Sequence, residues 1–123
     1  MHFDVFNGDA DGILALVQLR LAEPKKSTLV TGVKRDISLL KQVDITTATS
    51  VTVLDISMEK NTDALAELLA ANVPVDYTDH HRAGDIPSSS LLTATINTDA
   101  NTCTSLLVNE KLNGQFAIFF SRQ

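Results

Sequence analysis

Short apolar runs typical of strands alternate with helical patterns along the whole chain, and this alternation limits the fold more than any other feature. The expected strands are residues 2–6, 28–32, 51–56, 73–78 and 94–98, and the expected helices are residues 12–22, 37–43, 63–71 and 102–112. Strands that alternate with helices join through βαβ crossovers, which make the sheet parallel. The sequence predicts an α/β fold, a three-layer domain with a mainly parallel five-stranded sheet and helices on both faces. With 123 residues, the chain (1–123) is expected to form a single domain.

The sequence also predicts which two segments are most buried and which residues cap the last two helices. Residues 51–56 (VTVLDI) are β-branched and nearly all apolar, which predicts a central strand covered on both faces. Residues 12–22 (GILALVQLRLA) are apolar on more than one side, which predicts a well-buried helix. Ser57 or Asn61 is the expected N-cap of helix 63–71, and Asn101 or Thr102 that of the last helix.

Polar residues gather where the predicted strands end. Ligands of open α/β sheets bind outside the carboxyl ends of the strands, so these ends mark the expected site. The second strand offers only Gly32 and Lys34. The other ends supply Asn7, Gly8, Asp9 and Asp11, then Asp55, then Asp79, His80, His81 and Arg82, and finally Thr98, Asp99 and Asn101.

The chemistry of these residues favours a divalent metal ion. Asp9 and Asp11 in GDADG repel each other unless one is protonated or a cation lies between them, although a cap and a solvated side chain would also explain them. Asp55 ends an apolar strand, either as a ligand or as a cap. With His80, three carboxylates make a mixed oxygen and imidazole set that suits Mn²⁺, and less selectively Mg²⁺, Fe²⁺, Co²⁺ or Zn²⁺.

A pair of divalent ions bridged by a carboxylate is a known arrangement for phosphoryl chemistry. Asp55, on the central strand, is the natural bridging candidate. Two adjacent histidines beside Asp79 indicate metal ligation or phosphate contact, and Arg82 can pair with a phosphate.

Three motifs in this order resemble the DHH phosphoesterase superfamily: GDADG after the first strand, the lone Asp of VTVLDIS, and DHHRAG after a later strand. The segment NTCTSLLV is also similar to the stretch that opens a helix after DHH in many members. The superfamily contains single-strand-specific exonucleases, oligoribonucleases, cyclic-dinucleotide phosphodiesterases and manganese-dependent pyrophosphatases. The resemblance spans most of the chain and implies the N-terminal catalytic half of such an enzyme.

The resemblance also implies a role for each site residue. Asp9, Asp11, Asp55 and His80 would bind metal, with Asp55 bridging. His81 and Asp79 would be the catalytic pair, in which His81 contacts the substrate phosphate and Asp79 orients the histidines. The substrate would be a phosphodiester or phosphoanhydride, carried by a small molecule or a short single-stranded nucleic acid.

The chain departs from the superfamily pattern in ways that predict an impaired isolated domain. Val5 and Asn7 stand where some members carry a further His or Asp near the first metal, and no acid follows Glu110. The second domain, which closes over the substrate, is missing from these residues. The two-metal site is therefore expected to be incomplete and the 123-residue chain to turn over little.

Other classes of function stay open. A phosphoacceptor receiver domain would also place an acid like Asp55 after its third strand and a hydroxyl like Thr78 near its fourth. It needs a Lys after the fifth strand, where residues 97–101 read NTDAN and the next Lys is Lys111. A haloacid-dehalogenase-type phosphatase fits less well, because Ile13 matches its DxDxT/V pattern only in a shifted register. A non-catalytic metal- or nucleotide-binding module, or a subunit, is the third alternative.

Charge and hydropathy exclude some partners. Ten Lys and Arg against 15 Asp and Glu give a net charge of −5, which argues against binding to duplex DNA through a broad basic face. No apolar run is longer than that of residues 13–17, which is too short to span a bilayer, so we expect no membrane association and a cytoplasmic protein. Three Phe residues fall in the run FAIFF at 116–120, which predicts self-association through this segment or its packing on the sheet.

Overall fold

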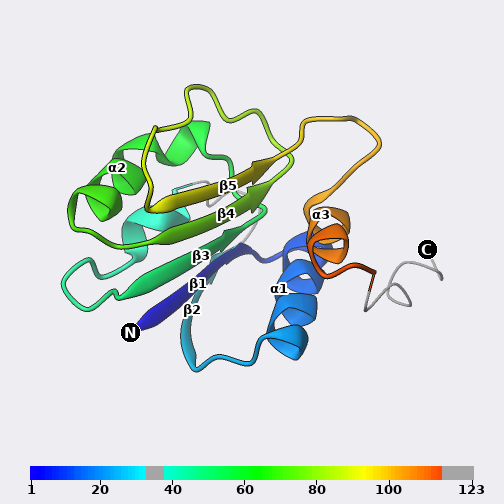
Figure 1. Ribbon diagram of the computed structural model, residues 1–123, viewed down its shortest axis with the longest axis horizontal. Helices are drawn as coiled ribbons and strands as arrows, with labels where there is room; N and C mark the ends of the chain where they lie inside the picture. The colour runs from blue at the N-terminus through cyan, green and yellow to red at the C-terminus, as the bar shows by residue number, and fades with distance from the viewer. Residues whose placement is uncertain (33–37, 115–123) are drawn as a thin grey trace.

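The computed structural model describes residues 1–32 and 38–114, and five strands form a sheet that is parallel throughout (Figure 1). The strand order is β2-β1-β3-β4-β5. The elements in chain order are β1 (His2–Asn7), α1 (Ala10–Ala22), β2 (Ser27–Gly32), the 3₁₀ turn η1 (Leu39–Gln42), β3 (Ser50–Leu54), the 3₁₀ turn η2 (Glu59–Asn61), α2 (Thr62–Ala70), β4 (Val75–Asp79), β5 (Leu92–Ile96) and α3 (Thr104–Lys111).

The helices cover both faces of the sheet, so the predicted three-layer α/β fold is confirmed. In Figure 1, α1 and α3 lie together on one face, and α2 lies on the other. Side chains alternate along each strand, so one strand serves both layers. Val5 and Val53 join the larger core beneath α2 and η1, whereas Phe6 and Leu54 pack under α1 and α3.

The expectation for the central strand is confirmed, but that for the first helix is wrong in part. β3 lies between β1 and β4, and its last four residues are buried. Helix α1 buries Ala15, Leu16 and Leu19, but its second apolar stripe faces outward. The stripe consists of Ile13, Val17 and Leu21, which are 43%, 38% and 56% exposed. Residues four apart share one side of a helix, and the sheet can bury only the opposite side.

Several elements begin or end at other residues than predicted, and local backbone conformation explains two of these differences. The third strand ends at Leu54 rather than at residue 56, because Asp55 adopts a left-handed conformation with φ of 64°. The fourth begins at Val75 rather than at residue 73, after a proline that cannot donate to the ladder. The fifth strand is shifted to Leu92–Ile96, and the segment expected as helix 37–43 forms the turn η1.

The predicted N-cap of α2 is confirmed in position at Asn61, but that of the last helix is wrong. Asn61 occupies the N-cap position of α2, but its side chain accepts a hydrogen bond from the Leu40 amide and donates one to the Ser57 carbonyl. The last helix has Cys103 at its N-cap, without a cap from that side chain. A carboxylate from elsewhere in the fold caps it instead, as described below.

Some predictions fall on residues that lie outside the described ranges. These are the self-association segment 116–120, Lys34 and the first residue of the expected helix 37–43. Within the described ranges, the helices are too short or too polar to cross a bilayer.

Candidate metal centre

The loops that carry the predicted ligands meet where β1 and β3 lie side by side. The chain leaves β1 through α1 on one face and leaves β3 through α2 on the other (Figure 1). Such a reversal opens a crevice at the carboxyl ends of the two strands, and ligands of α/β sheets bind there. Asp9 and Asp11 follow β1, Asp55 follows β3, and His80 follows β4.

Asp55 is the buried centre of this group. The residue is 1% exposed, and its Oδ1 accepts a hydrogen bond of 3.0 Å from the Thr104 hydroxyl. Burial, reinforced by the charges of Asp11 and Asp9, raises the pKa of Asp55 to about 8. A buried carboxyl group next to two other acids is stabilised by a proton or by a cation.

The ring of His80 is placed between two carboxylates. Its Nε2 lies 3.1 Å from Asp55 Oδ1 and 3.5 Å from Asp11 Oδ2. His80 therefore brings the loop after β4 into contact with the acids that follow β1 and β3. The ring also lies against that of His81, with centroids 4.3 Å apart and the ring planes tilted by 36°.

Asp79 holds His81 through one oxygen and leaves the other without a partner among the described residues. The Asp79 Oδ1 atom lies 2.7 Å from the Nδ1 atom of His81, one of the two histidines that Asp79 is predicted to orient. Asp79 is fully buried, and burial raises its pKa although the neighbouring His81 acts in the opposite direction. Its Oδ2 is buried and unpartnered in the described parts of the chain. A buried carboxylate oxygen without a hydrogen-bond partner is stabilised by a proton or by a bound cation.

Four side chains of the described residues have their donor atoms within 4.8 Å of one another and can hold a metal ion. They are Asp55, Asp79, His80 and His81. The set combines two carboxylates with two imidazoles, which suits Mn²⁺, Fe²⁺, Co²⁺ or Zn²⁺ and does not distinguish among them. Asp55 and His80 are common to this cluster and to the set predicted from the sequence.

Asp9 and Asp11 lie beside the cluster but also serve as helix caps. Asp9 Oδ1 accepts a hydrogen bond from the Gly12 amide, which caps α1. Asp11 accepts hydrogen bonds from the amides of Thr104 and Ser105 at 3.1 and 2.7 Å, which caps α3. Burial alone would raise the pKa of Asp11, but the hydrogen bonds from Ser105 and Thr104 hold it below its usual value.

The glycine that follows Asp11 fits a space in which no side chain could be placed. A Cβ atom added to Gly12 would lie 2.1 Å from the Asn7 carbonyl oxygen, far inside van der Waals contact. The small residue lets the start of α1 lie against the end of β1. The GDADG sequence therefore places its two carboxylates at the edge of the sheet through close backbone packing.

The remaining predicted residues do not belong to the four-residue cluster. Arg82 is exposed on the loop beyond the histidines. Asp99 binds the Asn101 amide in a local turn, and Asn97 binds the Asp99 amide in the same way. The Asn97 and Asp99 side chains thus stabilise a turn in the loop between β5 and α3.

Sequence reasoning did not assign Thr104 and Ser105 to the site. Thr104 contacts two acids: its hydroxyl donates a hydrogen bond to Asp55, and its backbone amide donates one to Asp11. The available signal was a run of small hydroxyl residues, TCTS, at the start of a helix. The contact itself joins residues far apart in sequence, so spacing could not reveal it.

No protein-family model matches the chain, and a search of the curated proteins found no significant match.

Proposed function

We propose that the chain is a metal-dependent phosphoesterase domain of the DHH type, which hydrolyses a phosphodiester or phosphoanhydride. The observation that carries this proposal is the cluster of Asp55, Asp79, His80 and His81 at the carboxyl edge of a parallel sheet. The resemblance of GDADG, VLDIS and DHHRAG to that superfamily supports it. Mn²⁺ is the proposed ion.

The residues present fit a divalent ion. Asp79 Oδ2 is a buried carboxylate oxygen with no partner among the described residues, and Asp55 is a buried acid among other acids. Asp55 and His80 would hold the ion, with Asp79 as a further donor of the cluster and Asp9 and Asp11 beside it. Bound there, a divalent ion supplies a water nucleophile at neutral pH and neutralises charge on the phosphoryl oxygens.

Other residues of the site would orient the ligands and contact the substrate phosphate. Asp79 fixes the His81 ring by its Nδ1 atom, so Nε2 of that ring is directed away from Asp79. The His81 side chain is 43% exposed and can therefore meet a phosphate from solvent. Thr104 fixes Asp55, so the acid keeps one orientation. Arg82, one residue further along an exposed loop, is the proposed second contact to the phosphate.

The proposal is tested by comparing metal binding with turnover. Calorimetry with Mn²⁺ should show binding to the wild-type protein and a loss of at least about tenfold in affinity in His80→Ala. Hydrolysis of a chromogenic phosphodiester, which we expect to be slow, should require Mn²⁺ and disappear in the same variant. Asp85→Ala, which removes an exposed acid close to the histidines in sequence, is the matched control and should behave as wild type. Equal Mn²⁺ affinity in wild type and His80→Ala would contradict the proposal.

The second candidate is a metal-binding module without catalysis, and one observation favours it. Asp9 and Asp11 already accept hydrogen bonds from backbone amides, so fewer of their lone pairs are open to a second ion. Saturable Mn²⁺ binding that depends on His80, without hydrolysis of any phosphodiester or of pyrophosphate, would identify this module. Stable phosphorylation of Asp55 by a small phosphodonor would instead identify a receiver domain.

A further inference from the structure

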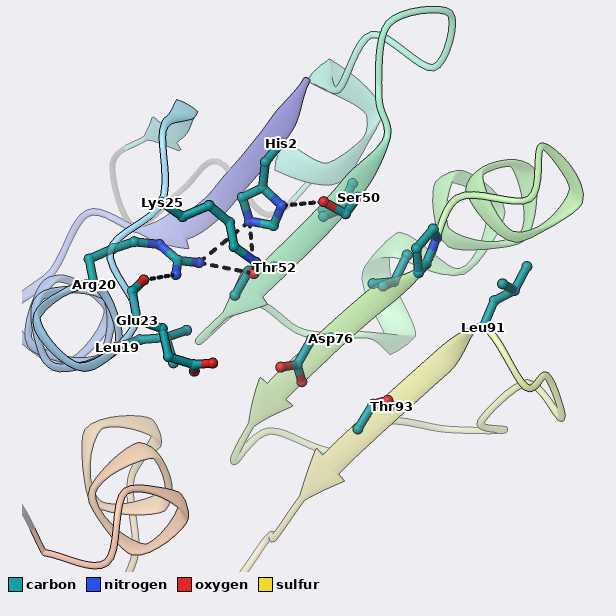
Figure 2. Close-up of a pocket in the computed structure, with 13 residues that line it drawn as sticks. His2, Leu19, Arg20, Glu23, Lys25, Ser50, Thr52, Asp76, Leu91 and Thr93 are labelled. Atoms are coloured by element: carbon teal, nitrogen blue, oxygen red, sulfur yellow. Dashed lines mark hydrogen bonds between the residues drawn. The ribbon is translucent and has the colours of Figure 1, made fainter.

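A second group of chemically active residues lies at the opposite end of the sheet from the metal centre. A pocket of about 190 Å³ opens between the last turn of α1 and the amino-terminal ends of β3, β4 and β5. Figure 2 shows His2 and Ser50 side by side in its wall, joined by a hydrogen bond. Among its other lining residues are Arg20, Lys25 and Asp76.

The hydrogen bonds in this wall run from a serine through a histidine to an aspartate. Ser50 Oγ lies 2.6 Å from His2 Nδ1, and His2 Nε2 lies 3.0 Å from Asp4 Oδ1. His2 and Asp4 are two residues apart on β1, so both side chains project from the same face of the sheet. Ser50 pairs with His2 in the register of β1 and β3. Ordinary parallel pairing therefore assembles the three groups.

The charge of Asp4 decides which atom donates in each bond. Asp4 is fully buried and receives two hydrogen bonds from Arg20, at 2.8 and 2.9 Å, which favour its ionised form. An ionised carboxylate only accepts, so His2 Nε2 carries a proton and donates a hydrogen bond to Asp4. Nδ1 of the neutral ring then accepts, and the Ser50 hydroxyl donates to it.

We propose that Ser50, His2 and Asp4 form an acyl-transfer site, with Ser50 as nucleophile, His2 as general base and Asp4 as the residue that fixes the imidazole. The proton relations are those of a Ser-His-Asp hydrolase, with the two ring nitrogens exchanged. The pocket is smaller than the ~300–1,000 Å³ usual for drug-sized ligands, so the substrate class is an ester with a short acyl group.

The reaction balances with these groups and water. The Ser50 oxygen forms a bond to the acyl carbon while its proton passes to His2 Nδ1. The adduct then collapses, the bond to the leaving alcohol breaks, and His2 returns the proton to that alcohol's oxygen. Water hydrolyses the acyl-serine by the same route and releases the carboxylic acid. Lys25, which lines the same pocket, is the side chain that would stabilise the negative oxygen of the adduct.

The test uses the whole chain with a fluorophosphonate probe and with p-nitrophenyl acetate, both in the presence of EDTA. We expect one label per chain, mapped to Ser50 by peptide mass spectrometry, and a burst of nitrophenol. Ser50→Ala should abolish both, and His2→Gln should slow labelling by about 100-fold or more, the usual contribution of a general base. Ser27→Ala is the matched control, because Ser27 donates to the same Asp4 at 2.7 Å and pairs with His2 in the register of β1 and β2, but among the described residues its side chain makes no hydrogen bond with that of His2. This variant should label at a rate near that of wild type.

Each outcome decides the proposal. Absence of label on Ser50 in the wild-type chain, or a label that maps to another residue, overturns it without the need for any variant. Labelling of His2→Gln at the wild-type rate overturns the role of the base. Circular dichroism of each variant separates loss of chemistry from loss of fold. Labelling that persists in EDTA and in His80→Ala distinguishes this site from the metal centre.

Discussion

Asp55 combines burial, like-charged neighbours and an uncommon backbone conformation in one residue. Its φ of 64° lies in the left-handed region, where Asp and Asn are tolerated better than most side chains. Strain of this kind costs of order 1–3 kcal/mol and gathers at functional sites. The backbone conformation and the burial of this acid therefore both reduce the stability of the fold.

Replacement of Asp55 by Asn should stabilise the metal-free protein. The amide keeps the shape and the left-handed backbone, accepts the Thr104 hydrogen bond, and removes a buried acid from beside Asp9 and Asp11. We expect a gain of about 1–3 kcal/mol in urea unfolding in EDTA near neutral pH. The same variant should lose Mn²⁺ binding by calorimetry. A variant less stable than wild type would show that the carboxyl group contributes to the fold.

The pH dependence of stability should report on His2. Burial holds the pKa of His2 below its usual value of 6.5, with Lys25 and Arg20 acting in the same direction and Asp4 opposing. The unfolded chain therefore takes up a proton at higher pH than the folded chain does. The stability that neutral His2 contributes is complete above pH 6.5 and is lost as the pH falls below that value.

Urea unfolding of wild type and His2→Gln measures this contribution as a difference, which removes the effect of the other titrating groups. The stability advantage of the wild type should narrow between about pH 7.5 and about pH 5. An advantage that is constant or grows toward acid would contradict the lowered pKa.

At the scale of the elements, Asp11 couples two helices. Its side chain belongs to the first turn of α1 but satisfies two amides at the start of α3. These amides have no partners within their own helix, and their dipoles favour a negative charge. The position of α3, and with it Thr104, thus depends on α1.

Asp11→Ala should destabilise α3 more than any other helix. Loss of a capping side chain costs about 0.5–2 kcal/mol, and here two amides lose their acceptor. Hydrogen exchange should show faster exchange at the amides of residues 107–111, with α2 unchanged. Asp9→Ala, which uncaps α1 instead, is the comparison: faster exchange of α3 in both variants would mean that the effect is not specific to Asp11.

Sequence reasoning located the strands but not their ends. The strands could be predicted because β-branched apolar runs alternate with amphipathic segments. The observed strand ends differ from the predicted ends by a few residues, because single residues determine where the strands begin and end. Asp55 ends β3 through its backbone conformation, and the proline before β4 removes a donor. The cap of α3 was mispredicted because its acceptor, Asp11, lies 93 residues from Thr104.

For the whole molecule, the sheet order explains why much of the site could be predicted. Parallel strands bring all their carboxyl ends to one edge, so Asp55 and His80 could be placed together from sequence alone. The amino-terminal ends of the strands also meet at one edge, where Ser50 lies beside His2. The spacing of His2 and Asp4 on one strand was a usable signal, but Ser50 enters only through the pairing of β1 with β3.

Binding of a metal should stabilise the whole domain. A ligand that binds only the folded state at 100 times its Kd contributes about 2.7 kcal/mol, which for a domain of this size raises Tm by roughly 10 °C. We expect this shift with Mn²⁺ in scanning calorimetry of the wild type and of Asp85→Ala, and its absence in His80→Ala. An equal shift in His80→Ala would place the ion elsewhere on the chain.

The left-handed backbone at Asp55 also has a genetic consequence. Codons for Asp lie a single nucleotide from those for Asn and for Gly, the two residues that accept such a backbone most readily. Mutations at this position can therefore remove the carboxylate without unfolding the chain. Selection on folding alone would let this codon drift to Asn, so that only selection on the chemistry of the site would retain Asp55. In a mutational scan, abundance and metal binding should accordingly separate at this position.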